Sequence, residues 1–447
     1  MVLNRLFGRG KDAAAQTPAS PVPPPPDELD ALDHRDDDEP AEEMAAPEDA
    51  PERSWRERAD AVLPTGASTG SKRSEALYGS GDVDGPTHFV RAVGCRVTAV
   101  DGRRFLDCTM ALGAVALGYA EPRVTRAVVE AAGEGNACAL SSWREVELAE
   151  RLCAIIPCAE RAQFLKSGAE ATSAAVRLAR TYTGRDRVVA SGYFGWHDWS
   201  SDAAGVPQAT RRDVTRVPFD DLDALERAVA AAGSDLAAVV IEPVVEREPS
   251  TAWLERARAL CDAAGAALIF DEIKTGFRVA PGGYQEVCGV TPDLASFGKA
   301  MANGYPLAAV VGRAPLMTAA RKTWISSTLA SESTALAASL AVLDWHDEAD
   351  ICATLAETGR EMRAAVDRAI AASGVAGVRT DGVDAMWLLR WDETANETRF
   401  LRAALDAGVL FKRGAYDFAA IAHDDEALAE IEAAASAALV SLKSGHA

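Results

Sequence analysis

Short apolar runs alternate with amphipathic helical stretches through the middle of the chain, and this alternation restricts the fold more than any other feature. The apolar runs are bounded by turn residues and cover residues 187–191, 237–242, 266–271 and 307–312. Helical periodicity covers residues 122–132, 143–156 and 172–183. Strands that alternate with helices predict an α/β fold, with a mostly parallel sheet covered on both faces.

The regions on either side of this alternation predict further parts of the chain. Residues 94–107 contain two short alternating strands around an Asp101-Gly102 turn, which predicts a β-hairpin. A long helix is expected from about Glu332 to Trp345, within a smaller α+β domain. The predicted organisation is a tail (1–57), an N-terminal segment (58–105), a large domain (106–328) and a C-terminal small domain (329–447).

Negative charge is concentrated near the start of the chain. The formal net charge is -21, and residues 27–52 hold 13 Asp and Glu against one Arg. A segment rich in Pro, Ala and acids buries too little apolar surface to offset its ordering entropy, so a disordered tail is expected. Binding to nucleic acid is not expected, because phosphate neutralisation needs clustered Lys and Arg.

The eight cysteines are scattered, without a Cys-x-x-Cys pair or a matching His spacing, so no metal site is expected. The sequence has no apolar segment of signal-peptide length near its start and no uninterrupted apolar span of about 20 residues. We therefore expect a cytoplasmic protein that is neither exported nor membrane-spanning.

Acidic residues stand at the ends of two apolar runs, Glu242 and Asp271, where ligands of parallel sheets collect. Lys299 follows Asp271 by 28 residues and leaves a Ser-Phe-Gly turn. Such a pair would hold pyridoxal phosphate by both ends, with the carboxylate on the ring nitrogen and the lysine in an imine with the aldehyde. Taken alone, each residue has a simpler structural interpretation: Asp271 as a strand-end cap and Lys299 as a solvated loop cation.

Two further patterns suit the same cofactor. Ser167 and Gly168 precede a periodic helix, whose free N–H groups attract phosphate, although such a turn is also an ordinary helix cap. Tyr193 opens an aromatic stretch that offers a face for a pyridine ring, although a core cluster or a surface loop would look the same. His197 in this stretch is expected to be a hydrogen-bonded structural histidine.

Taken together, these motifs resemble class III (subgroup II) pyridoxal-phosphate-dependent aminotransferases, and most of all the glutamate-1-semialdehyde aminomutase-like branch. The resemblance runs from about Val93 to the Ala422-His-Asp-Asp-Glu stretch, with the motifs in family order and spacing. It implies the fold-type I architecture of these transferases, with a mostly parallel central sheet in a large domain and a smaller α+β C-terminal domain. It also implies pyridoxal 5'-phosphate as cofactor and a homodimer with shared active sites.

The resemblance carries residue roles. Lys299 matches the Schiff-base lysine, and Asp271 matches the partner of the pyridine nitrogen. Ile273 matches the aliphatic residue packed on the ring face opposite the aromatic Tyr193. The other positions that match cofactor contacts are Ser167, Gly168 and Ala169 of the phosphate turn, Thr328 from the neighbouring subunit, and Glu242, an acid near the cofactor.

The chain also departs from the family pattern. Phe194 replaces the histidine that follows the stacking tyrosine, and Ala169 replaces a common hydroxyl, at a cost of about one hydrogen bond, ~1 kcal/mol. The Ser-Pro-Val-Arg stretch, whose arginine grips a substrate carboxylate, has no counterpart in residues 74–82. Loss of that guanidinium removes the usual carboxylate recognition, and the candidate substitutes Arg73 and Arg413 lie in no matching motif.

We therefore expect an aminotransferase that moves an amino group between a primary amine and an aldehyde or ketone. The favoured substrate is an amino sugar or aminoglycoside-type intermediate of secondary metabolism, as in antibiotic biosynthesis. An aminomutase or epimerase is the alternative, because both reactions share the same electron sink. A catalytically silent relative that serves as a binding subunit is disfavoured by the intact Lys299 and Asp271.

Overall fold

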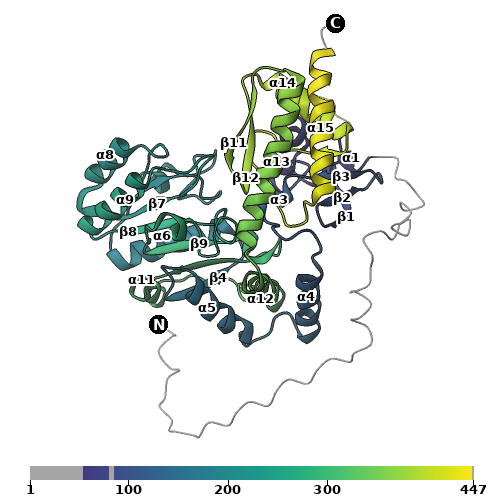
Figure 1. Cartoon of the computed structure of the whole chain (residues 1–447). Helices are drawn as coiled ribbons and strands as arrows, with labels where there is room; N and C mark the ends of the chain where they lie inside the picture. Colours follow the sequence, from purple (N-terminus) through teal and green to yellow (C-terminus); the bar gives the residue numbers. More distant parts are fainter. Residues whose placement is uncertain (1–53, 80–84, 445–447) are drawn as a thin grey trace. The chain divides into compact units, whose positions relative to one another are not determined.

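The computed structural model describes residues 54–79 and 85–444 (Figure 1). The predicted tail lies outside these residues as far as residue 53, and helix α1 (Trp55–Val62) begins three residues before the predicted start of the N-terminal segment. The centre of the fold is a seven-stranded sheet in the order β4-β10-β9-β8-β7-β5-β6. Its strands are β4 (Arg161–Leu165), β5 (Arg187–Ser191), β6 (Val214–Arg216), β7 (Leu236–Ile241), β8 (Ala267–Asp271), β9 (Leu294–Phe297) and β10 (Ala308–Gly312).

The central sheet is buried on both faces, as the sequence predicts. Every residue of β7 and β8 is buried, and alternate side chains enter two separate apolar clusters. Val239 and Phe270 belong to the larger cluster, whereas Val240 and Ile269 belong to the smaller one. Successive side chains of a strand point to opposite faces of the sheet. Consecutive apolar residues therefore need other elements packed on both faces.

The sheet is mixed, although it is mostly parallel. The pairs β5–β6, β5–β7, β7–β8 and β8–β9 are parallel, as expected. Strand β10 runs antiparallel to both β9 and β4, which apolar content alone does not reveal. Only a short stretch, residues 298–307, separates β9 from β10, and an antiparallel neighbour needs no crossover helix.

The helices of this region start and end close to the predicted positions. Helix α6 (Gly168–Thr183) packs on the sheet, and α12 (Ser333–Glu348) packs against α4 (Pro122–Glu134) and α5 (Trp143–Ile155). Further helices are α7 (Gln208–Arg211), α8 (Leu222–Ala232), α9 (Thr251–Ala264), α10 (Tyr284–Cys288), α11 (Ala314–Thr318), and the 3₁₀ helices η3 (Gly233–Asp235), η4 (Lys299–Ala302) and η5 (Ala319–Lys322). In the described part of the chain, no helix has the length and apolar content to span a membrane.

Two smaller sheets contain the remaining strands of the described chain. The predicted hairpin forms from β2 (Arg96–Ala99) and β3 (Arg104–Asp107), and β1 (Phe89–Val93) pairs with β2. Strand β13 (Val409–Leu410) adds to β3 in parallel, so that the C-terminal region completes the N-terminal sheet. The third sheet contains β11 (Val378–Val383), β12 (Met386–Trp391) and β14 (Asp417–Phe418).

The C-terminal helices stand together beside these sheets, with α15 (Asp425–Ser444) packed against both α13 (Ile351–Ser373) and α14 (Thr394–Asp406) (Figure 1). The remaining helices are η2 (Gly70–Lys72), α2 (Ser74–Tyr78) and α3 (Met110–Gly113). The described residues belong to one compact unit, so the predicted domain boundaries remain predictions.

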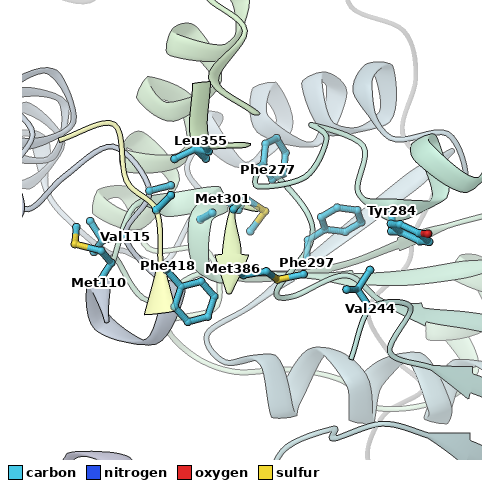
Figure 2. Close-up of a cluster of buried hydrophobic side chains, with 14 of the residues drawn as sticks. Met110, Val115, Val244, Phe277, Tyr284, Phe297, Met301, Leu355, Met386 and Phe418 are labelled. Carbon is cyan, nitrogen blue, oxygen red and sulfur yellow. The ribbon is translucent and has the colours of Figure 1, made fainter. Parts of the chain in front are cut away.

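A continuous apolar cluster connects the N-terminal segment, the central sheet and the C-terminal region (Figure 2). Met110 comes from the N-terminal side, Phe297 and Met301 flank the turn after β9, and Met386 and Phe418 come from the C-terminal sheet. All five side chains are at most 3% exposed. The turn after β9 is therefore embedded in the core.

Arg278 is a fully buried cation inside this junction. Its guanidinium donates to the main-chain oxygens of Gly113 at 3.1 Å, Ala385 at 3.3 Å and Ala419 at 2.8 Å. It also lies 4.9 Å from the centroid of the Phe418 ring. Burial lowers the pKa of Arg278 to about 10, which leaves it charged at neutral pH. One side chain thus ties together three separate parts of the chain.

We predict that Arg278→Met lowers the free energy of unfolding by about 3 kcal/mol, because buried carbonyl groups of all three segments lose their donor. Urea unfolding of the purified variant measures this loss. Arg379→Met is the matched control, because the Arg379 side chain is 63% exposed and its ion pair with Asp392 is 3.7 Å long. The control should change stability by less than ~0.5 kcal/mol. Equal losses in both variants would contradict the assignment of Arg278 as an internal clamp.

Candidate active site

The carboxyl ends of three neighbouring strands bring the predicted acids and the predicted lysine into one region. Glu242 follows β7 directly, and Asp271 is the last residue of β8. Asp271 lies opposite Ser296 of β9, and Ser296 precedes Lys299 by three residues. These strands are parallel, so their ends meet at the same edge of the sheet.

Lys299 begins the 3₁₀ helix η4 in a conformation that is rare for a side chain with a Cβ. Its φ is 49°, in the left-handed region, which costs energy and needs support from the surrounding fold. Asn303, at the end of η4, supplies part of that support by accepting from the backbone N–H groups of Ala116 and Leu117. Burial and the nearby charge of Lys274 lower the pKa of Lys299 to about 8. A lowered pKa makes the neutral, nucleophilic amine more accessible.

Asp271 is a buried carboxyl, 5% exposed, at the end of β8. Its Oδ1 accepts from the backbone N–H of Ile273 at 3.1 Å. Burial and the neighbouring Glu242 raise the pKa of Asp271 to about 8. A buried carboxyl with a raised pKa is stabilised in its charged form by any cationic group that enters the site.

Ser167, Gly168 and Ala169, the residues predicted to contact the phosphate, lie at the N-terminus of α6. Ser167 caps the helix by accepting from the backbone N–H of Glu170 at 3.3 Å, and the Glu170 carboxylate accepts in return from the backbone N–H of Ser167 at 2.8 Å. Within the described residues, neither Gly168 nor Ala169 has an acceptor for its backbone N–H. Both positions thus retain free donors at the positive end of a 16-residue helix.

Ile273 lies between this helix terminus and the lysine turn. A Cβ placed on Gly168 would stand 2.6 Å from Ile273 Cδ1, and one on Gly298 would stand 3.7 Å from Ile273 Cγ2. A side chain at position 168 would therefore displace Ile273. The contacts bring the phosphate turn, Ile273 and the residue before Lys299 together.

The aromatic stretch packs against the start of α6. Thr172 Oγ1 donates to the Phe194 carbonyl at 3.0 Å, and a Cβ on Gly195 would meet Ala169 Cβ at 2.4 Å. His197 shares a 2.7 Å hydrogen bond with Ser173, in agreement with the structural role expected for it. The ring of Tyr193 is not packed in the protein, since the residue is 73% exposed, while its backbone N–H donates to Glu242 Oε2 at 3.0 Å.

Lys274 and Tyr416 are parts of the site that sequence reasoning did not assign. The Lys274 ammonium is 2.7 Å from Glu242 Oε1 and donates to Tyr416 Oη at 3.0 Å. Burial opposes the charge of Lys274, but Glu242 and Tyr416 outweigh it and raise the pKa of Lys274. The signal for Lys274 was its place three residues after Asp271, whereas Tyr416 lies 142 residues further along and had none.

Thr328 lies in a different setting from the other predicted residues. It is exposed and lines a hollow of about 390 Å³ with residues 134–144 and Ser331–Ser333. Glu332 of this hollow forms a 2.7 Å ion pair with Lys166, the residue that precedes the phosphate turn. The hollow is therefore linked to the site, although no contact joins Thr328 itself to Lys299 or Asp271 in the described chain.

The two arginines considered for carboxylate recognition both lie at helix α2. Arg413 donates to the carbonyl of Glu75 at 3.3 Å and lies 4.0 Å from Glu397. Arg73 is exposed and precedes helix α2. Of the segment that lacks the family arginine, Ser74–Tyr78 fold as α2, and Arg413 contacts this helix at Glu75.

A model of the family described as aminotransferase class-III matches residues 78–420. The chain belongs to the class-III aminotransferases. This finding confirms the resemblance drawn from the motifs and identifies the chain as an enzyme of the transaminase family, in which isomerases also occur.

Curated relatives include transaminases and an aminomutase. A 3-aminobutyryl-CoA aminotransferase of Cloacimonas acidaminovorans is 36% identical over 299 residues, which are 65% of this chain and 72% of the relative. A 2'-deamino-2'-hydroxyneamine transaminase of Streptomyces kanamyceticus is 38% identical over 300 residues, 66% of this chain and 76% of the relative. A glutamate-1-semialdehyde 2,1-aminomutase of Polynucleobacter necessarius is 32% identical over 428 residues, 86% and 98% of the two chains.

Solved structures agree on fold and cofactor. The PLP internal aldimine form of the FumI protein from Sphingopyxis sp. MTA144 has a TM-score of 0.83 at 28% identity and covers 87% of this chain and 96% of its own. A transaminase with PLP bound has a TM-score of 0.80 at 25% identity, covering 88% and 98%. The expected fold is confirmed, and the cofactor is pyridoxal phosphate.

The raised pKa of Asp271 predicts a pH dependence of stability in the cofactor-free protein. Its ordinary value is 3.8 and its folded value about 8, so the folded state binds the proton more tightly. This group therefore lowers the free energy of unfolding as pH rises between these two values. Asp271→Asn removes the effect, and the variant should gain at least ~1 kcal/mol relative to wild type between about pH 5 and 8.

Urea unfolding of both cofactor-free proteins across this pH range measures the difference. Asp392→Asn serves as the control, because the Asp392 side chain is 71% exposed, and its difference from wild type should stay constant. A pH-independent difference for Asp271→Asn would show that the carboxyl does not titrate in this window.

Proposed function

We propose that Lys299 binds pyridoxal phosphate covalently through its Nζ and that Asp271 pairs with the protonated ring nitrogen. The observation that carries this proposal is the shared position of the two residues at the ends of adjacent parallel strands, β8 and the turn after β9. Bound pyridoxal phosphate supplies an electron sink for the bond broken next to the transferred nitrogen. Asp271 suits this cofactor, because a positive ring nitrogen would stabilise its buried carboxylate.

The other described residues fit the remaining parts of the cofactor. The free N–H groups of Gly168 and Ala169 would bind the phosphate at the N-terminus of α6. Ile273 would pack on one face of the ring, since it lies between this terminus and the residue before Lys299. Tyr193 would cover the opposite face, and Glu242 holds the Tyr193 backbone in place.

Lys299 is also the residue that we propose moves the proton during the reaction. The Lys299 amine would lie close to the reacting carbon and, when not linked to the cofactor, would be free to hold or move a proton there. With a pKa of about 8, this amine can both take up and return a proton near neutral pH. Lys274 is less suited to the role, because its pKa is raised and its ammonium is held by Glu242 and Tyr416.

We further propose that the enzyme transfers an amino group from a primary amine to an aldehyde or ketone of an amino sugar or aminoglycoside-type intermediate. Support comes from the missing carboxylate-binding arginine and from the Streptomyces kanamyceticus relative, which acts as a 2'-deamino-2'-hydroxyneamine transaminase. The aminomutase outcome is the second candidate, supported by glutamate-1-semialdehyde 2,1-aminomutases among the relatives.

A homodimer with shared active sites is part of the same proposal. The hollow that contains Thr328 is lined by the exposed apolar side chains of Leu140 and Trp143, which are 80% and 60% exposed, and Leu329, which follows Thr328, is 50% exposed. Apolar side chains grouped in this way favour an interface. A cytoplasmic location is proposed from the eight cysteines, all within the described residues and none paired in a disulfide.

The covalent assignment predicts that Lys299→Ala loses the cofactor linkage completely. Borohydride reduction of the yellow wild-type protein, followed by peptide mass spectrometry, should place the added mass on the peptide that contains Lys299. Lys322→Ala, which changes an exposed lysine, should keep both colour and adduct. An adduct on Lys274 or another side chain would overturn the proposal.

The substrate assignment predicts that the purified enzyme aminates a sugar aldehyde faster than it converts glutamate-1-semialdehyde. We expect kcat/KM to differ by at least ~10-fold, because the site lacks the bidentate arginine for a carboxylate. Both rates are measured with the same amine donor, and Lys299→Ala gives the background. Faster conversion of glutamate-1-semialdehyde would favour the aminomutase.

A further inference from the structure

Two acids and two lysines share the region at the strand ends, and one ion pair joins an acid to a lysine. Lys274 Nζ lies 2.7 Å from Glu242 Oε1, and the two side chains are 8% and 13% exposed. A buried ion pair is expensive to break by removing one partner, since the other charge stays behind without compensation. Lys274 therefore matters to the charge balance of the site.

Lys274 is fixed from a second direction by the C-terminal region. Its ammonium donates to Tyr416 Oη at 3.0 Å and lies 4.1 Å from the centroid of the Tyr416 ring. The same hydroxyl accepts from the backbone N–H of Glu246 at 2.7 Å, in the segment after β7. These contacts hold the Lys274 ammonium in place beside the Glu242 carboxylate.

Two other charged groups, Asp271 and Lys299, interact with this pair, and Arg278 acts on Lys299. Asp271 ends the adjacent strand, Lys299 follows the strand beyond it, and the buried Arg278 follows Lys274 by four residues. Glu242 is a main cause of the raised pKa of Asp271 after burial, and Lys274 acts in the opposite direction. Lys274 also lowers the pKa of Lys299, second only to burial. Each charge of the pair is therefore felt by a residue proposed to hold the cofactor.

We propose that Lys274 is a positioning residue, which supplies the counter-charge of Glu242 and so leaves the charge of Asp271 available to the ring nitrogen of the cofactor. Glu242 keeps its contact with the Tyr193 backbone while its charge is balanced within the protein. The inference rests on the proposed function, and it assigns to Lys274 a role distinct from that of Lys299.

The test compares Lys274→Met, which removes the ammonium from a side chain of similar length, with the double variant Glu242→Gln/Lys274→Met. The readout is the pH midpoint of the visible absorbance change of the bound cofactor, together with the fraction of cofactor retained after dialysis. The single variant adds one uncompensated negative charge, so its midpoint should move to higher pH by about one unit or more. The double variant removes both charges and should return the midpoint to within ~0.3 unit of wild type.

Arg258→Met is the matched control. Arg258 also forms an ion pair with a buried carboxylate, that of Asp293 at 2.8 Å, but this pair lies at the amino end of β9. Its removal should leave the midpoint within ~0.3 unit of wild type. A shift in this control as large as that of Lys274→Met would overturn the local assignment.

The remaining outcomes also decide the question. Cofactor lost from the single variant but retained by the double variant supports charge compensation, because a packing role would make the double variant the worse of the two. An unchanged midpoint in Lys274→Met, or loss of cofactor from both variants, overturns the proposal. Failure of the proposed function is seen separately, in a wild-type protein that carries no cofactor adduct on Lys299.

Discussion

The meeting of parallel strand ends is the constraint on which the rest of the site depends. Glu242, Asp271 and the turn that carries Lys299 stand side by side because β7, β8 and β9 run in the same direction. A parallel sheet places these ends at one edge without any specific contact between the side chains. Burial then raises the pKa of Asp271 and lowers the pKa of Lys299, whereas the contacts with Glu242 and Tyr416 raise the pKa of Lys274.

This arrangement is rigid because the lysine turn is part of the core. Phe297 and Met301 are fully buried on either side of it, and Asn303 joins it to the segment after α3. The positive φ of Lys299 is supported by these contacts. Preorganisation of this kind holds a side chain in position for a ligand, so that no conformational entropy is lost in ordering it at each turnover.

Local patterns in the sequence predicted those parts of the fold that depend on local physics. Strand β5 and the start of α4 and α5 are reproduced, and β7, β8 and β10 differ by a single residue at one or both ends, because burial of both faces leaves a clear apolar run. The direction of β10 relative to its neighbours was not predictable, since an apolar run is the same whether its strand is parallel or antiparallel. The contact of Lys274 with Tyr416 was not predictable either, because it depends on how the C-terminal region docks on the sheet.

The clamp made by Arg278 has a consequence for how such enzymes diversify. Its guanidinium donates hydrogen bonds to main-chain oxygens, at Ala385 and Ala419 among others, and it also lies over the Phe418 ring. The hydrogen bonds to main-chain oxygens depend on the backbone path, so substitutions elsewhere than at Phe418 leave them intact where that path is preserved. Loops that contact different substrates can therefore be exchanged around this joint, because its hydrogen bonds recognise the position of backbone oxygens.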